Sequence, residues 1–424
     1  MCFLALAILF SLVPAVRASG FLVFLSVLAT LFALALALAA VSHAGFALHK
    51  TSTPDFLFVL LINPLESAFV FFQWFPLARV WPQREDSNRS RRLLAIARGL
   101  LLSFPFCLIF VTLFASADMQ FYNMIEALDD WEFERLIYHT FFSVVFAWLA
   151  LTILVFFYFS NRALSAVSNP GESGNTWATE LIVVLVVINV IFVVYGYFQL
   201  GYLFGGIEHI MRTPNLTVAE YARRGFFESA TACALVLIIL QLFGERLYGL
   251  GGTAQRTYKV LAIIQISLAL VVIASAFQRI MLYTDSFGLT QDRLYVYVAL
   301  SWMMLCFVWF VATLVLPWRN RFILGAIGLG YVCFGATVAL NPDAYVAAVN
   351  VARYQEVGEF DTAYATRLSD DAIPVLAEAV DDFDDVHRKP VLNLIRERVA
   401  SKEDDAVWTM NYTRFRLISE YGEY

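Results

Sequence analysis

The sequence has few charged residues for its length. Only 15% of its 424 residues are charged, 60% are hydrophobic, and the mean hydropathy is +0.70. A soluble domain is closer to about half apolar and about a quarter charged. So much apolar surface is difficult to bury in a water-soluble core, whereas a lipid bilayer accommodates it on the outer faces of helices.

Motifs for metal binding and catalysis are also lacking. The five cysteines form no Cys-x-x-Cys pair and the five histidines are scattered, so we expect no metal, no cofactor and no disulfide framework. There is no Gly-x-Ser-x-Gly, no Walker loop, no His-Glu-x-x-His and no basic nucleic-acid motif. Asp381-Asp382 and Asp384-Asp385 lack the glycine and closing glutamate of a calcium loop, which favours a solvated acidic face. These absences weigh against an enzyme without excluding one.

Ten apolar stretches separated by hydrophilic loops fill most of the chain. A membrane helix needs about 20 mostly apolar residues. The stretches are Cys2–Val16, Phe21–Val41, Phe56–Leu77, Leu94–Phe114, Leu136–Phe159, Leu181–Phe204, Phe226–Phe243, Val260–Tyr283, Leu294–Leu316 and Phe322–Leu340. The sequence therefore predicts an all-α, polytopic membrane helix bundle of about ten spans over residues 1–340.

Two of these stretches leave alternatives open. Cys2–Val16 is short and is compatible with a signal peptide cleaved after Ala18, although no basic residue precedes it. Phe56–Leu77 contains Asn63-Pro64, with Glu66 near its middle. It either crosses as a broken helix of the kind that couples ions to transport, or lies in the interface with Glu66 in water. The choice gives ten spans or nine.

Charge alternates in sign from loop to loop. The basic loops are Arg79–Arg98, the stretch around Arg162, Glu245–Lys259 and Trp318–Arg321, and the acidic ones are Asp118–Glu134, Asp285–Asp292 and the tail after Asn341. Lys and Arg favour the cytoplasmic side of a membrane. The pattern predicts a multi-pass protein of the bacterial cytoplasmic (inner) membrane with its C-terminal tail outside. Ten spans place both termini outside and Arg17 inside.

The tail, residues 341–424, has the composition of a small soluble domain. It carries 9 Lys and Arg against 17 Asp and Glu, so its net charge is 9 − 17 = −8. Helical spacing from Tyr345 to Arg353 predicts a first helix that ends at Gly358, and Ser369 is placed to cap a second. Later helices are expected over His387–Ala400 and Asp404–Glu420. We therefore expect an acidic, outward-facing helical module.

A series of sequence boxes in fixed order resembles a known family. The boxes are Ser116-Ala117-Asp118, Gln199-Leu200-x-Tyr202-Leu203-Phe204-Gly205-Gly206, Tyr221-Ala222-Arg223-Arg224-Gly225-Phe226-Phe227-Glu228, Arg279-x-x-Leu282-Tyr283, Gly288-Leu289-Thr290-x-x-Arg293, Asn350-x-x-Arg353-Tyr354, Gly358-x-x-Asp361, Leu368-Ser369-x-Asp371-Ala372-x-Pro374 and Trp408-x-x-Asn411. From about Leu94 onward the chain resembles the bacterial membrane-protein group called domain of unknown function 4153/4173. The resemblance implies a membrane protein with a C-terminal soluble segment. It brings no catalytic residue and no substrate.

Four charged residues form a candidate anion-binding or lipid-binding site: Arg223, Arg224, Glu228 and Arg279. Glu220, Arg224 and Glu228 recur every four residues and share a helix face where a span begins. Two arginines near a helix start suit a phosphate, a carboxylate or a lipid headgroup. The alternative is a structural charge ladder that fixes how deeply the helix inserts.

Arg279 lies inside an apolar span, where an unpaired charge costs several kcal/mol. It either extends to the interface or pairs with Glu228 or Asp285 in a polar pocket. Four further residues are candidate intramembrane polar groups: Glu66, Asn189, Gln199 and Gln265. The amides are expected either to hydrogen-bond between helices or to line a substrate path.

These observations favour a non-enzymatic scaffold, sensor or accessory factor of the bacterial envelope. A transporter or lipid- or anion-handling protein with an outer arginine site is the alternative, and an enzyme acting on lipid headgroups is a third possibility. The expected partners are the lipid bilayer and a protein bound through the tail. The small-residue face of the last span, which includes Gly325, Gly328 and Gly335, allows close helix packing within the monomer or in a homo-oligomer.

Overall fold

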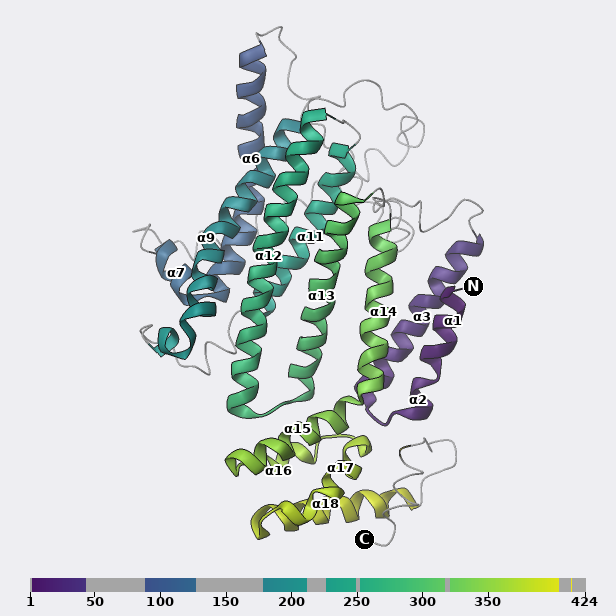
Figure 1. The fold of residues 1–424 in the computed structure, drawn as a ribbon. Helices are drawn as coiled ribbons and strands as arrows, with labels where there is room; N and C mark the ends of the chain where they lie inside the picture. Colours follow the sequence, from purple (N-terminus) through teal and green to yellow (C-terminus); the bar gives the residue numbers. More distant parts are fainter. Residues whose placement is uncertain are drawn as a thin grey trace, which may run out of the picture. The chain divides into compact units, whose positions relative to one another are not determined.

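The computed structural model describes residues 2–42, 88–126, 178–211, 226–248, 252–316, 321–403 and 413. Every regular element within these ranges is a helix, as predicted (Figure 1). Six of the helices are long and apolar enough to cross a membrane. They are α6 (Asn88–Ala117), α9 (Ala178–Met211), α11 (Phe226–Tyr248), α12 (Gly252–Phe287), α13 (Gln291–Val315) and α14 (Phe322–Leu340). The predicted spans Phe56–Leu77 and Leu136–Phe159 lie outside the described residues.

The first two apolar stretches also form helices. The first is divided into α1 (Cys2–Ser11) and α2 (Val13–Val16), and the second is α3 (Gly20–Ser42). Pro14 stands in the first turn of α2, where its missing N–H leaves no helical hydrogen bond unmade.

The chain forms two compact units, which we describe separately. The first comprises residues 1–48, 280–306 and 324–424, and the second comprises residues 49–279 and 307–323.

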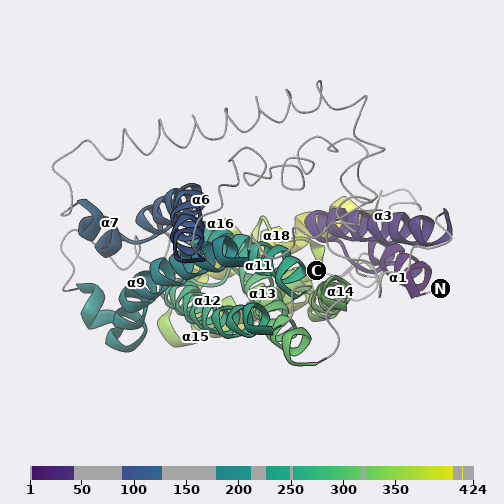
Figure 2. The same cartoon turned by 90° about the horizontal axis from the view of Figure 1, so that it is seen from above.

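In the second unit, α6 and α9 lie side by side and run in the same direction (Figures 1 and 2). Arg98 on α6 pairs with Glu180 on α9 at 3.8 Å, and about four turns further along both helices the ring of Phe114 stacks on that of Tyr195 at 3.8 Å between centroids. Gly99 permits this close approach, because a Cβ at that position would lie 2.7 Å from the Cβ of Val183. The parallel course of α6 and α9 brings their C-terminal ends together.

In the first unit, α1 and α2 pack against α14. Phe10 stacks on Phe334 at 5.0 Å between ring centroids. Arg17 donates from Nε and Nη2 to the carbonyl of Val338, at 3.0 and 2.6 Å, and so neutralises the last carbonyls of α14. Arg17 therefore lies at the same end of α14 as the C-terminal tail. Ten spans would place Arg17 on the opposite side from the tail, and this contact contradicts that alternative, because charge counting could not detect the role of Arg17 as a helix cap.

The tail begins with four helices that share one core. They are α15 (Pro342–Val357), α16 (Thr362–Ala365), α17 (Ile373–Glu378) and α18 (Asp385–Glu403), with short 3-10 turns at Asp370–Ala372 and Val380–Asp382. We call residues 341–403 the C-terminal module. Its core includes Val346, Leu376, Phe383 and Ile395, all buried. Each fully buried side chain of this kind stabilises the fold by about 1.5–3 kcal/mol.

The helix boundaries of the module follow its cap residues. Gly358 ends α15 with φ +75°, a conformation that costs glycine little. Ser369 accepts the N–H of Asp371 and starts the turn before α17, as its position in the sequence predicted. Of the predicted last helix, Asp404–Glu420, only Thr413 is among the described residues.

Candidate functional site

A buried ion pair lies where α6, α9 and α12 meet in the second unit. The side chains of Arg279 and Asp118 are 3% and 1% exposed, and Arg279 Nη2 lies 3.2 Å from Asp118 Oδ2. The same Nη2 donates to Gln199 Oε1 at 2.8 Å, and Nη1 donates to the carbonyl of Ala117 at 3.2 Å. Ser275 Oγ donates to Gln199 Oε1 at 2.7 Å. The guanidinium thus joins three helices.

Asp118 also has a local role. Its Oδ1 accepts the backbone N–H groups of Gln120 and Phe121, at 2.9 and 3.0 Å, and so caps the short helix α7 (Met119–Glu126). The carboxylate is held by backbone donors on one side and by Arg279 on the other. Within the described part of the chain Arg279 thus forms its ion pair with Asp118, and not with the predicted partners Glu228 or Asp285.

The other predicted polar residues have different environments. Gln199 joins the Arg279 cluster and also donates to Asp118 Oδ2 at 3.3 Å. Asn189 donates within its own helix, to the carbonyl of Leu185 at 2.8 Å. Gln265 is fully buried, and its amide has no hydrogen-bond partner among the described residues. Glu228 is half-buried in the first turn of α11. Three predicted residues lie outside the described ranges: Arg223, Arg224 and Glu66.

In the first unit, the C-terminal module is attached to the turn between α12 and α13. Asn350 donates to the carbonyl of Leu289 and accepts its N–H, both at 2.8 Å. Arg353 donates to the last carbonyls of α12, those of Asp285 at 3.2 Å and Ser286 at 2.9 Å. Tyr364 Oη accepts the N–H of Gln291 at 2.7 Å. Side chains of the module thus satisfy the main-chain groups of a membrane-helix turn.

Gly288 makes this attachment possible. Its φ is +76°, and a Cβ there would lie 2.7 Å from Asn350 Oδ1. Only glycine adopts this conformation without strain and leaves space for the amide. We call the contacts of Asn350, Arg353 and Tyr364 with residues 285–291 the turn clamp.

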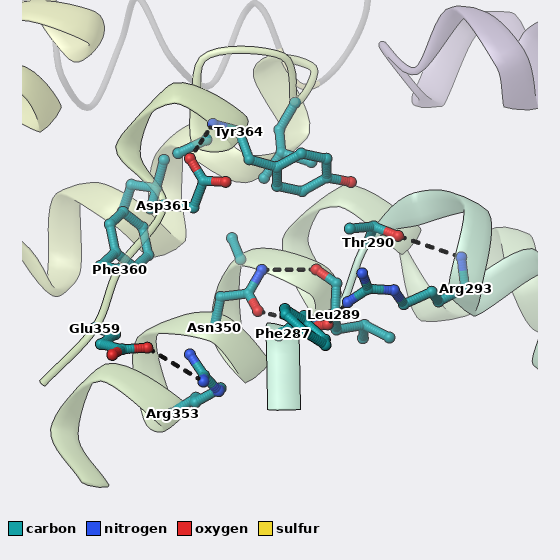
Figure 3. Close-up of a pocket in the computed structure, with 15 residues that line it drawn as sticks. Phe287, Leu289, Thr290, Arg293, Asn350, Arg353, Glu359, Phe360, Asp361 and Tyr364 are labelled. Atoms are coloured by element: carbon teal, nitrogen blue, oxygen red, sulfur yellow. Dashed lines mark hydrogen bonds and ion pairs between the residues drawn. The ribbon is translucent and has the colours of Figure 1, made fainter. Parts of the chain in front are cut away.

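Beside the turn clamp lies a cavity of about 260 Å³ (Figure 3). Arg293 and Thr290 from α13 and its preceding turn line one side, and Arg353, Asp361 and Tyr364 from the module line the rest. Arg293 stacks over the ring of Tyr283 at 4.0 Å and donates to the carbonyl of Gly288. Burial raises the pKa of the Tyr364 phenol above its usual value, so the phenol is neutral at pH 7.

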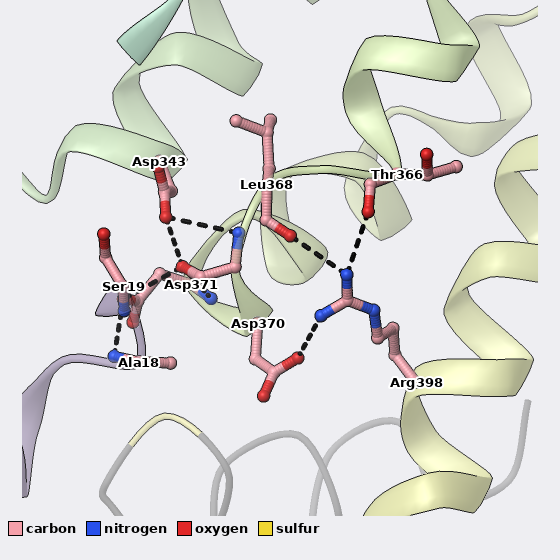
Figure 4. A network of polar contacts seen from close by, with 9 residues as sticks. Ala18, Ser19, Asp343, Thr366, Leu368, Asp370, Asp371 and Arg398 are labelled. Carbon is pink, nitrogen blue, oxygen red and sulfur yellow. Dashed lines mark hydrogen bonds and ion pairs between the residues drawn. The ribbon is translucent and has the colours of Figure 1, made fainter. Parts of the chain in front are cut away.

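A second set of contacts joins the module to the turn between α2 and α3 (Figure 4). Asp371 Oδ2 accepts the N–H groups of Ala18 at 2.8 Å and Ser19 at 3.3 Å, and its Oδ1 accepts the hydroxyl of Thr413 at 2.5 Å. Asp343, fully buried, accepts from both the N–H and the hydroxyl of Ser369. The two carboxylates thus accept hydrogen bonds from the main-chain N–H groups of Ala18, Ser19 and Ser369, which would otherwise need water.

An ion pair inside the module completes this network. Arg398 donates to Asp370 at 2.9 Å and to the carbonyls of Thr366 at 2.9 Å and Leu368 at 3.2 Å. It thereby ties α18 to the loop between α16 and α17.

Sequence reasoning did not identify the turn clamp or the cavity as a site. Four of their residues, Arg293, Asn350, Arg353 and Asp361, do lie in boxes that carry the family resemblance, those beginning at Gly288, Asn350 and Gly358. Nothing in a single sequence indicates that Asn350 contacts the turn at Leu289, because the two residues are 61 positions apart. Within the described part of the chain, no group of three His, Cys, Asp or Glu side chains is placed to hold a metal ion.

These features define a class: a helical membrane protein whose C-terminal helices are hydrogen-bonded to turns between its apolar helices. The chain belongs to the family Domain of unknown function (DUF4153), which it matches over residues 4–379. This match confirms the resemblance found in the sequence. No curated protein and no solved structure shows significant similarity to the chain.

Proposed function

We propose that this protein is a non-enzymatic scaffold, sensor or accessory factor of the bacterial envelope, which holds the C-terminal module at the outer surface of the inner membrane for a protein partner. The turn clamp is the observation that supports this function. A tethered domain needs only a linker, whereas here Asn350, Arg353 and Tyr364 bond directly to the α12–α13 turn. A movement of the module on binding a partner would therefore be transmitted to α12 and α13 through these hydrogen bonds.

The exposed charge of the module supports a basic partner surface. Nine acidic side chains of the module are exposed: Glu356, Glu359, Asp361, Glu378, Asp381, Asp382, Asp384, Asp385 and Glu397. Among its described side chains only three basic ones are exposed: Arg367, Lys389 and Arg396. Complementary charge raises association rates and selects partners.

The direction of the helices supports a particular membrane topology. The module follows Leu340, and Asp371 binds the α2–α3 turn, so both lie on one side. Counting crossings back through α13, α12, α11 and α9 puts Ala178 on the opposite side. Because α6 runs parallel to α9, Asn88 is on that side too. This topology requires one crossing between α7 and α9, for which the sequence predicts the span Leu136–Phe159.

The same count favours nine spans, the lower of the two numbers that the sequence left open. Helix α3 begins on the module side and ends at Ser42 on the other side, where Asn88 also lies. The segment between them begins and ends on one side, which agrees with Phe56–Leu77 lying in the interface. The basic loops then face the cytoplasm, the N-terminus is inside and the module is outside.

Cysteine labelling tests this topology. A membrane-impermeant maleimide applied to spheroplasts should label Glu378→Cys in the module and leave Ser42→Cys and Thr253→Cys unlabelled until the membrane is opened. Labelling of Ser42→Cys from outside would contradict nine spans. Protection of Glu378→Cys would contradict the outward orientation.

Truncation tests the scaffold function. A chain ending at Leu340 should lose a stoichiometric protein that co-purifies with the full chain from native membranes. Arg256→Gln, at an exposed position of α12, is the control and should retain it. An unchanged set of co-purifying proteins after truncation would refute the proposal.

The contacts of Arg279 bear on the alternative, an outer anion site made by Arg223, Arg224, Glu228 and Arg279. Its charge is neutralised by Asp118 and its donors reach Gln199 and Ala117. These contacts support a structural role for Arg279.

A further inference from the structure

The cavity beside the turn clamp has an unusual charge arrangement for its small size. Four charged side chains line it: Arg293, Arg353, Glu359 and Asp361. The two positive and two negative charges cancel, yet they come from different elements around the cavity (Figure 3). A simple anion or a simple cation would therefore find a like charge in the same cavity.

Both signs of charge retain hydrogen-bonding capacity. Arg293 uses Nη1 for the carbonyl of Gly288, and its Nε and Nη2 have no hydrogen-bond partner among the described residues. Asp361 uses Oδ1 to accept the N–H of Tyr364 at 2.8 Å, and within the same ranges Oδ2 has no partner. Arg353 is 3.6 Å from Glu359, whose side chain is 76% exposed, so that pair is weak.

The position of the cavity suits a group at the membrane surface. It lies at the end of α12, a membrane-spanning helix, and Phe287 at its rim is 55% exposed. Buried apolar side chains such as Leu289 and Leu368 form part of its lining. The lining thus combines buried apolar side chains, one exposed aromatic ring at the end of an apolar helix, and charged groups that are open to solvent.

We propose that this cavity binds a phosphoethanolamine group, with the phosphate on Arg293 and Arg353 and the ammonium on Asp361 and Glu359. The guanidinium of Arg293 can bind phosphate oxygens through its paired Nε and Nη2 groups. Arg353 adds a positive charge beside them, while its own Nε and Nη2 donate to the carbonyls of Asp285 and Ser286. A primary ammonium donates three hydrogen bonds to carboxylates. About 260 Å³ holds such a headgroup and excludes a macromolecule. The site goes beyond the scaffold function and does not depend on a protein partner.

The group has two possible sources with the same chemistry: a phospholipid headgroup or free phosphoethanolamine. The exposed ring of Phe287 favours the lipid, because it lies at the end of α12, a helix long and apolar enough to cross a membrane.

The test is native mass spectrometry of the full-length protein in nanodiscs. Phosphatidylethanolamine mixed with phosphatidylglycerol is compared with phosphatidylcholine mixed with phosphatidylglycerol. The wild type should retain one phosphatidylethanolamine, at least 10-fold in preference to phosphatidylcholine, whose methylated ammonium donates no N–H bond to a carboxylate.

Two matched variants separate charge in the cavity from charge elsewhere on the module. Asp361→Asn removes the negative charge and keeps Oδ1 to cap Tyr364, so the fold should persist. It should lose at least 10-fold in retention. Glu378→Gln removes the same charge from an exposed position outside the cavity and should retain the lipid.

Soluble O-phosphoethanolamine identifies the source. If it binds the detergent-purified wild type and not Asp361→Asn, while no phosphatidylethanolamine is retained, the free group is the ligand and the headgroup chemistry holds. Equal retention of both lipids by the wild type, without binding of the soluble probe, would overturn the proposal. So would equal retention by Asp361→Asn and Glu378→Gln. The lipid comparison on the wild type stands even if a variant fails to fold.

Discussion

Neutralising Arg279 should strongly destabilise the protein. In Arg279→Gln the carboxylate of Asp118, 1% exposed, keeps its two backbone donors and loses its only ionic partner in the described structure. Breaking a buried ion pair by removing one partner costs about 3–5 kcal/mol. On membrane-insertion scales, an unpaired aspartate at the centre of a helix costs about 2.5–3.5 kcal/mol, which agrees with the cost of breaking the ion pair. At about 1.4 kcal/mol per factor of ten, the ratio of folded to unfolded protein should fall at least about 100-fold.

The effect is measured as the free energy of unfolding of the purified protein in nanodiscs. Arg256→Gln, in the same helix at an exposed position, is the matched control and should change stability by less than about 0.5 kcal/mol. Adding Asp118→Asn to Arg279→Gln should restore part of the loss. The asparagine oxygen still caps α7, and no buried charge is left unpaired.

A double-mutant cycle over Arg279 and Asp118 should therefore give a coupling energy of about 2 kcal/mol or more. If Arg279→Gln and Arg256→Gln have the same stability, the ion pair has no structural role. Arg279 would then be available for the anion site that the sequence suggested.

Three other changes test the attachments of the module. Gly288→Ala should cost about 1–2 kcal/mol, because alanine is strained at φ +76° and its Cβ meets Asn350. Limited proteolysis should therefore cut the module faster than in a Gly328→Ala control, where a Cβ has open space. Asp371→Ala should cost about 1–3 kcal/mol, because two N–H groups of the α2–α3 turn lose their acceptor, and unchanged thermal stability would contradict that role. His387 lowers the pKa of Asp384 in the folded protein. A carboxyl group whose pKa falls on folding stabilises the folded protein above its unfolded pKa of about 3.9, and this stabilisation is lost as the pH falls through the folded pKa. The melting temperatures of wild type and Asp384→Asn should therefore converge below about pH 4.

The fold class could be read from the sequence because membrane crossing depends on local composition. The stretch Phe322–Leu340 was predicted with the bounds that α14 has, and Gly358 ends α15 as expected. Apolar length and a glycine at a helix end act over a few residues, so no tertiary information is needed. Helix ends were less accurate: α12 continues through Phe287, four residues beyond the predicted Tyr283.

The candidate site was harder to predict. Arg279 was identified as a residue in need of a partner, and Gln199 as a polar group in a span, yet the ion pair with Asp118 was not foreseen. The two residues are 161 positions apart, and their meeting depends on the parallel packing of α6 with α9. Arg17 was assigned to a side by charge alone, although its hydrogen bonds to α14 outweigh a statistical preference.

The sequence by itself determined that the chain is an all-helical membrane protein of its family, where its apolar helices lie, and the bounds of Phe322–Leu340. These properties follow from hydrophobicity and cap residues along one dimension. The tertiary structure alone decided which charges neutralise each other, which side of α14 receives Arg17, and that Asn350, Arg353 and Asp361 surround one cavity. Those contacts depend on the direction of helices that are distant in sequence and on the faces through which they pack. The same hydrophobic pattern is compatible with many such arrangements.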